Sequence, residues 1–132
     1  MTHRFTVSTK ARTDFVDVTA HVQKVLDTSE MKNGICFVFI PHTTAGVTIN
    51  ENADPDVKAD IINSLERVVP WKNRYRHIEG NSAAHIKASL VGFSCSIPFE
   101  NRRLVLGTWQ CIYFCEFDGP RVRNVIVTLT GS

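Results

Sequence analysis

The sequence predicts an α+β fold in which mixed, largely antiparallel β-sheets are packed with two or three helices. Short segments of alternating or wholly apolar residues recur along the chain, as is typical of strands. Longer segments between them repeat apolar residues every three to four positions, as amphipathic helices do. At 132 residues the chain is long enough to bury a core, and we expect residues 1–132 to form a single domain.

The N-terminal part predicts two strands, a helix and a third strand. Residues 5–8 alternate like a strand, and residues 15–18 can pair with them after a polar turn. Valines and a leucine at helical spacing predict a helix from Thr19 that ends near Gly34. Residues 35–40 are all apolar and stop at a proline, which indicates a strand buried on both faces.

The middle of the chain predicts a strand followed by two helices. Residues 47–51 alternate as a strand does. Asp54 and Pro55 are the residue types of a helix N-cap and first helical position, and an apolar stripe follows them as far as Pro70. A glycine then interrupts the chain before a further helix, which we expect over residues 83–91.

This further helix has two different faces. Asn81 or Ser82 can cap its start, which places His85 in the first turn. His85 stands above a row of small residues that leave open space beside the imidazole, as in a binding site. A separate apolar stripe, which we expect to face the core, consists of Ile86, Leu90 and Phe93.

The C-terminal third predicts an antiparallel meander. Residues 94–98 form a strand, and a long alternating segment covers residues 108–117. A turn over residues 118–121 leads to a returning strand over residues 122–130.

Composition favours a soluble globular protein. Hydrophobic residues make up 43% and charged residues 21%, and the net charge is only +2. No apolar run approaches the roughly 20 residues of a membrane helix, and the N-terminus lacks the layout of a signal peptide. We therefore expect a cytoplasmic protein without a membrane partner.

The spacing of the cysteines is consistent with a cytoplasmic protein. Cys36, Cys95, Cys111 and Cys115 contain no C-x-x-C pair. Cys111 and Cys115 share one predicted strand at roughly 13 Å, which is too far for a disulfide. We expect reduced, structural cysteines.

Nucleic acid is not an expected partner. Residues 71–76 mix aromatic and basic side chains, a combination that single-stranded nucleic acid can bind. The run is short and the chain is nearly neutral, so we interpret it as a solvated connection that can lend an arginine to a site.

Three histidines are candidates for a metal site. His77, Glu79 and His85 lie within nine residues, and His42 follows the apolar strand at its end. Three imidazoles suit zinc or another transition metal better than magnesium, which prefers oxygen ligands. The alternative is that each histidine only makes local hydrogen bonds. Glu51 falls on the apolar side of its strand, so it needs a partner, a metal ion or a raised pKa, and we consider it a candidate functional acid.

Three stretches of the chain resemble the YjbQ family. Residues 42–57 are similar to the first signature of that family, and residues 79–90, with His77 just before them, to the second. Residues 107–113 and 115–121 are similar to the third. The resemblance implies a YjbQ-like α+β domain, a homotrimer and a weak, secondary thiamine-phosphate synthase activity. That reaction is a transfer that joins a pyrimidine methyl pyrophosphate to a thiazole phosphate and expels pyrophosphate.

The site expected from these considerations binds a divalent metal and a phosphorylated small molecule. His42, His77 and His85 would hold the metal, and Glu51 and Glu79 would be catalytic or orient the ligands. The expected substrate-binding residues are Thr43, Thr44, Asn50, Gly80, Asn81, Trp109, Gln110 and Arg121. Two alternatives remain open: a non-catalytic module that binds a metal or a phospho-metabolite, and a trimer whose histidines are purely structural.

Overall fold

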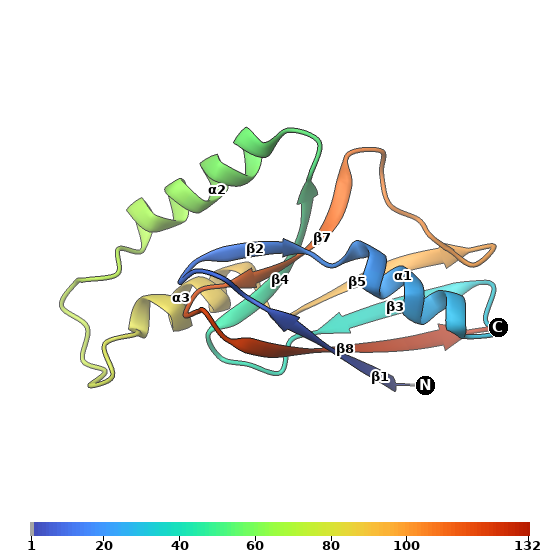
Figure 1. Ribbon diagram of the computed structural model, residues 1–132, viewed down its shortest axis with the longest axis horizontal. Coiled ribbons are helices and arrows are strands. Elements are labelled where there is room, and N and C mark those ends of the chain that lie inside the picture. The colour runs from blue at the N-terminus through green and yellow to red at the C-terminus, as the bar shows by residue number, and fades with distance from the viewer. Residues whose placement is uncertain (1) are drawn as a thin grey trace.

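The computed structural model describes residues 2–132, and within them the chain forms three helices and two antiparallel sheets. This confirms the predicted α+β class (Figure 1). None of the helices in the described residues is long and apolar enough to cross a membrane. The elements are β1 (Thr2–Ser8), β2 (Asp14–Asp17), α1 (Thr19–Thr28), β3 (Gly34–Phe39), β4 (Ala45–Glu51), α2 (Pro55–Val68), α3 (Ser82–Val91), β5 (Ser94–Glu100), β6 (Arg103–Leu104), β7 (Gln110–Glu116) and β8 (Val122–Gly131).

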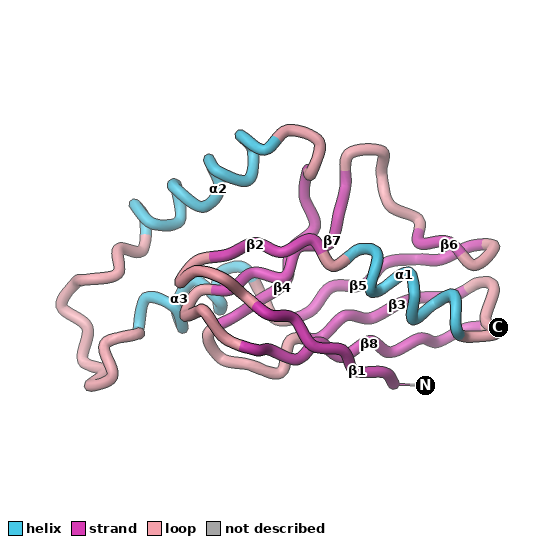
Figure 2. The backbone as a smooth tube through the Cα atoms, viewed as in Figure 1, coloured by secondary structure: helices cyan, strands magenta, loops and turns pink. Residues whose placement is uncertain are grey.

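The strands divide into a larger and a smaller sheet (Figure 2). The five-stranded sheet has the order β1-β8-β3-β5-β6, and the three-stranded sheet has the order β2-β7-β4. The main core lies between the two sheets and includes the buried side of α1. A second cluster covers the other face of the three-stranded sheet, where α3 and part of α2 pack against β7.

Two predicted strand pairings are wrong. β1 and β2 do not pair with each other, because β1 pairs with β8 and β2 with β7. β7 and β8 are also in different sheets, so the C-terminal third is not a meander. β7 is the middle strand of its sheet and is covered on both faces, and pairing with β2 and β4 satisfies both of its edges.

The prediction that residues 35–40 are buried on both faces is wrong as well. Cys36 and Val38 point into the core, but Ile35, Phe37 and Phe39 point outward and are 43, 42 and 46% exposed. No helix covers that side of the five-stranded sheet within the described residues (Figure 1). A wholly apolar strand therefore presents one apolar face to the surface.

Two of the three residues in the predicted apolar stripe, Ile86 and Leu90, lie opposite to their predicted position, whereas Phe93, just after α3, packs against the core as predicted. Ala84 and Ala88 are buried against the three-stranded sheet, whereas Ile86 and Leu90 are exposed, Leu90 by 62%. The small side chains allow α3 to lie close to β4, where a Cβ added to Gly46 would be only 2.5 Å from the Gly92 carbonyl oxygen. Close backbone approach therefore decides which face of α3 is buried.

The helix starts agree with the predictions, although α1 ends earlier than expected. Asp54 caps α2 by accepting a hydrogen bond from the Asp56 N–H at 2.9 Å, with Pro55 in the first turn. α1 ends at Thr28, where the Ser29 hydroxyl donates to the Leu26 carbonyl at 2.7 Å. Because the Ser29 side chain closes the last helical turn, the helix ends here and does not extend to Gly34.

The four cysteines are free, as predicted. Burial raises the pKa of Cys36 to about 12 and that of Cys95 to about 11. These thiols are therefore protonated near neutral pH and act as small apolar side chains.

Replacing Gly46 with alanine should destabilise the fold by about 1–3 kcal/mol, because the new methyl group would overlap a backbone oxygen that cannot move alone. Gly107→Ala is the matched control, since its added Cβ would meet the flexible Gln110 side chain at 3.2 Å. Urea denaturation of the two variants and the wild type measures the difference. Equal stability of Gly46→Ala and wild type would contradict the close approach of α3 and β4.

Candidate functional site

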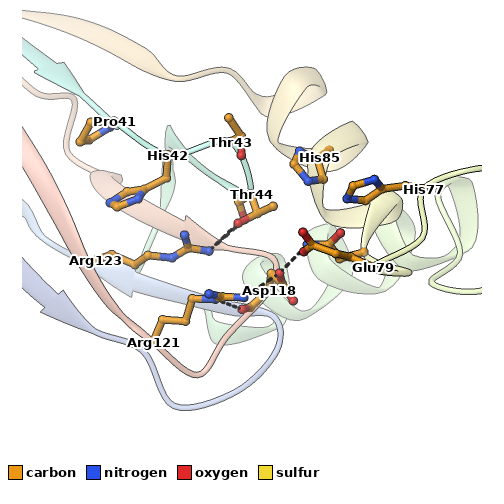
Figure 3. Close-up of a pocket in the computed structure, with 11 residues that line it drawn as sticks. Pro41, His42, Thr43, Thr44, His77, Glu79, His85, Asp118, Arg121 and Arg123 are labelled. Atoms are coloured by element: carbon orange, nitrogen blue, oxygen red, sulfur yellow. Dashed lines mark hydrogen bonds and ion pairs between the residues drawn. The ribbon is translucent and has the colours of Figure 1, made fainter.

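A polar cavity of about 500 Å³ opens where the N-terminal end of α3 meets the loop between β3 and β4 and the turn between β7 and β8 (Figure 3). Segments far apart in the sequence line it, so these residues come together only in the folded chain. Its lining residues are Pro41, His42, Thr43, Thr44, His77, Glu79, Asn81, His85, Asp118, Arg121 and Arg123.

A buried ion pair supports one wall of the cavity. Arg123 donates from Nε to Glu116 Oε1 at 2.8 Å, and its Nη2 pairs with Oε2. The same Nη2 donates to the Thr44 hydroxyl at 2.7 Å (Figure 3). Burial would raise the pKa of Glu116, but the hydrogen bonds from Arg123, the Asp118 N–H and Thr9 outweigh it and lower that pKa. Glu116 is therefore ionised, and it neutralises Arg123.

A second chain of polar contacts runs from β8 to α3. Arg121 donates from Nη2 to Asp118 Oδ2 at 3.0 Å, and the same oxygen accepts a hydrogen bond from Asn81 Nδ2 at 2.9 Å. The other end of the Asn81 amide, Oδ1, is buried and has no hydrogen-bond partner among the described residues. A buried acceptor without a partner is unfavourable by about 1–3 kcal/mol, so this oxygen is a natural contact for a ligand.

His42 faces the cavity from the strand side and already has a partner. Its Nε2 accepts a hydrogen bond from the Asn124 N–H at 2.9 Å. Burial first, and then the nearby positive charge of Arg123, lower the pKa of His42. The imidazole is therefore neutral at neutral pH, and its Nε2 lone pair is occupied.

His77 and His85 lie next to each other on the opposite side of the cavity, away from His42 (Figure 3). Their ring centres are 5.5 Å apart and the rings are nearly perpendicular. Glu79 lines the cavity beside them. Within residues 2–132, no three histidine, cysteine, aspartate or glutamate side chains are close enough together to hold a metal ion. The structure therefore brings two of the three proposed ligands together and keeps His42 apart.

The start of α3 borders the site. Asn81 occupies the N-cap position, but among the residues described no side chain caps this helix, because the Asn81 amide reaches Asp118 instead. Asn81 and His85 both line the cavity, so the positive dipole end of this ten-residue helix lies beside it. Such a helix start attracts phosphate and carboxylate groups.

Five of the predicted site residues lie outside the cavity. Glu51 and Gln110 are paired at the far end of the three-stranded sheet, about 20 Å along β4 from the cavity at ~3.3 Å per residue. Asn50 is exposed there and accepts the Glu51 N–H, and Trp109 is 64% exposed. Alternation along β4 correctly gives the side of the sheet on which Glu51 lies, but not the end at which a site forms. Gly80 lines a neighbouring cavity instead.

Arg123, Glu116 and Asp118 are site residues that the sequence analysis missed. A signal for Arg123 was present, because it shares the inward face of β8 with Val125, Val127 and Leu129. An arginine on an apolar face needs a buried counter-charge. Asp118 lies in a turn with Gly119 and Pro120, and turn chemistry alone accounts for its residue type.

Glu116→Gln should lower the free energy of unfolding at pH 7 by about 3 kcal/mol, because Arg123 would stay buried without its counter-charge. The pKa of folded Glu116 is lowered, so its stabilising contribution is present above the ordinary carboxyl value and is lost as the pH falls through the lowered value. The difference from wild type should therefore shrink below about pH 4.

Chemical denaturation across this pH range measures that difference, with the exposed Glu100→Gln as the control. A difference that stays constant down to acidic pH would show that the Glu116 charge does not stabilise the fold.

Comparison with known proteins identifies the family. A family model described as UPF0047 protein YjbQ-like matches residues 3–132. UPF0047 protein YugU of Bacillus subtilis is 49% identical over 126 residues, which are 95% of this chain and 96% of that protein. A UPF0047 protein of Methanocaldococcus jannaschii is 48% identical over 132 residues, 100% of this chain and 96% of its own. A crystal structure from Clostridium acetobutylicum, described as an uncharacterized conserved protein of the YjbQ/UPF0047 family, is 53% identical, covers 97% of this chain and 99% of its own, and superimposes with a TM-score of 0.95. The chain therefore belongs to the YjbQ (UPF0047) family.

Proposed function

We propose that the cavity binds the phosphate group of a small molecule and that the protein is an enzyme acting on phosphorylated substrates. The observation that carries this proposal is the convergence of three kinds of anion-binding group on one cavity. These are the guanidinium groups of Arg121 and Arg123, the hydroxyl groups of Thr43 and Thr44, and the uncapped start of α3. Each is common alone, and together they surround a space large enough for a small metabolite.

The charges around the cavity show what else phosphate binding needs. Arg121 and Arg123 line it, but so do Asp118 and Glu79, and Glu116 neutralises Arg123 from behind. With neutral imidazoles these full charges sum to about −1, which disfavours a phosphate dianion. Additional positive charge must come from protonated His77 and His85 or from a bound cation.

We propose that a divalent transition metal supplies this charge at His77 and His85. Two imidazoles bonded to one zinc ion at about 2.1 Å have their ring centres roughly 5 Å apart, and the observed 5.5 Å agrees. His42 does not fit this role, because its Nε2 accepts the Asn124 N–H. Glu79 and the free oxygen of Asn81 are nearby oxygen donors. When bound, the ion would neutralise phosphate oxygens as a Lewis acid.

The thiamine-phosphate synthase reaction implied by the family resemblance belongs to this proposal. In it, a thiazole ring nitrogen attacks a methylene carbon of the pyrimidine substrate, and the bond from that carbon to pyrophosphate oxygen breaks. No side chain has to remove a proton for this step. Arg121, Thr43 and the first N–H groups of α3 would hold the leaving pyrophosphate and stabilise its developing charge. Glu79 would orient His77 rather than act as a base.

The alternative is a module that binds the same phosphorylated molecule without converting it. The free acceptor Asn81 Oδ1, the exposed His77 ring and the half-buried His85 ring argue against purely structural histidines, because a structural role would leave such groups buried and bonded. A turnover assay with varied divalent metals separates an enzyme from a binding module.

His85→Ala should reduce synthase turnover at least about tenfold and reduce metal retained by the pure protein, because one of two paired imidazoles is lost. His21→Ala, which removes an imidazole stacked on Phe5 outside the cavity, is the control and should leave both unchanged. Elemental analysis, turnover and circular dichroism are the measurements.

Unfolding of both His85→Ala and His77→Ala would support structural histidines instead. If both variants fold and keep wild-type turnover and wild-type phosphate affinity, His77 and His85 do not belong to the functional site.

We further propose that the protein is a homotrimer that associates through the outward face of β3. Ile35, Phe37 and Phe39 form an exposed apolar row in the middle of the five-stranded sheet, which is unusual for a monomer surface. We also propose a cytoplasmic location, because the four cysteine thiols are free.

Phe37→Asp should convert trimers to monomers, because a charge would have to be buried in the apolar contact. Val68→Asp, at an exposed apolar position on α2, is the control and should remain a trimer. Sedimentation velocity gives the mass of each species. A wild-type monomer, or a trimeric Phe37→Asp, would overturn the assignment of this face.

A further inference from the structure

The α2–α3 connection, residues 69–81, carries two residues of the candidate site, His77 and Glu79. It loops out from the two sheets (Figure 1). Among the described residues, every hydrogen bond that residues 70–80 make stays within the connection. Contacts of side chains near its two ends must therefore fix where His77 and Glu79 lie.

Each end of the connection is tied to the rest of the molecule by one side chain. At the C-terminal end, Asn81 Nδ2 donates to Asp118 Oδ2 at 2.9 Å. At the N-terminal end, the Trp71 ring packs against the second hydrophobic cluster. The guanidinium carbon of Arg12 lies 4.1 Å from the centre of that ring and covers one of its faces. The Arg12 side chain therefore holds the N-terminal end of the connection in place from outside.

The main chain around Arg12 is attached to the opposite wall of the cavity. The Arg12 carbonyl accepts a hydrogen bond from the Gly119 N–H at 3.0 Å, and the Thr9 N–H donates to the Arg121 carbonyl at 2.8 Å. The fit is close, because a Cβ added to Gly119 would lie 2.4 Å from the Ala11 carbonyl oxygen. The turn between β1 and β2 is therefore fixed against the turn between β7 and β8, which lines the cavity.

Arg12 itself does not line the cavity, and its side chain is exposed. No carboxylate in residues 2–132 forms an ion pair with it, so the Trp71 ring is the partner of its guanidinium group. We propose that Arg12 is a positioning residue: through the Trp71 ring it holds His77 in place beside the other candidate metal ligand. This inference rests on the proposed function, in which the paired imidazoles hold a metal ion.

NMR spectroscopy of the metal-free protein tests the positioning role directly. The His77 and His85 ring centres are 5.5 Å apart, so their ring protons should give a nuclear Overhauser effect in the wild type. Arg12→Leu should weaken this effect at least about twofold, because the contact that holds Trp71 is lost. Arg12→Lys keeps a cation that can lie over the ring and should keep the effect. Arg67→Leu, at an exposed arginine on α2, is the matched control and should behave as wild type.

Zinc titration of the same variants measures the consequence for the site. Arg12→Leu should weaken zinc binding about threefold, the order expected from the loss of one exposed cation–π contact. At saturating zinc its affinity for inorganic phosphate should be unchanged, because Arg121 and Thr43 do not belong to the connection. Trp71→Leu should weaken zinc binding at least as much, and adding Arg12→Leu to it should have no further effect, since both changes remove one contact.

A wild-type effect between the rings that survives in Arg12→Leu, or a loss that Arg12→Lys does not restore, would overturn the role of Arg12 whether or not zinc binds. Absence of the effect in wild type would overturn it too. Wild-type protein that shows the effect but binds no zinc would overturn the proposed metal site, and the NMR comparison would still decide the positioning role. If circular dichroism shows that Arg12→Leu is unfolded, Arg12→Gln, which also lacks the charge, takes its place.

Discussion

The buried ion pair of Glu116 and Arg123 holds the two sheets and the cavity in one arrangement. Glu116 ends β7 in the smaller sheet and Arg123 lies at the start of β8 in the larger sheet, so the turn between them is fixed at its base by opposite charges. The Thr9 hydroxyl, just after β1, and the Thr44 hydroxyl, just before β4, bond to the same pair. Desolvating two charges is unfavourable by several kcal/mol per ion, so the arrangement needs this complete set of partners. We infer that the pair contributes more to the choice of a single strand arrangement than to net stability.

Close packing of α3 explains why the catalytic candidates stand at a helix start. Alanines on the buried face and Gly46 on β4 let the helix lie directly on the smaller sheet, with its first turn at the end of that sheet where Arg123 emerges. Lys87, also buried, pairs with Glu66 and joins α3 to α2. The segment between these helices is therefore anchored at both ends, although α2 itself has no fully buried residue. That anchoring positions His77 and Glu79 beside His85.

Local patterns predicted local structure well and long-range pairing poorly. The cap at Asp54, the strand after Gly34 and the helix carrying His85 follow from residue types within a few positions, and the structure confirms them. The membership of β1 and β2 in different sheets depends on pairing with strands roughly a hundred or more residues away, which no window of sequence contains. The site shows the same division. His77 and His85 are close in sequence and in space, whereas Glu51 was placed with them only because its pattern was unusual, and β4 carries it to the other end of the sheet.

The distribution of hydrogen-bond donors and acceptors in the cavity indicates which kind of molecule it can bind. Side-chain donors come from the strand side, where Arg121 and Thr43 line the wall. Asp118 on that side already accepts from Arg121 and Asn81, so the acceptors without a partner lie on the helix side, at Glu79 and the free oxygen of Asn81. A bare anion would satisfy the first group and leave the second unpaired. A phosphorylated molecule accompanied by a cation, or carrying a hydroxyl or N–H group of its own, would satisfy both. The unpaired oxygen of Asn81 therefore argues for a composite ligand, and a cavity built only to trap inorganic phosphate would have no use for it.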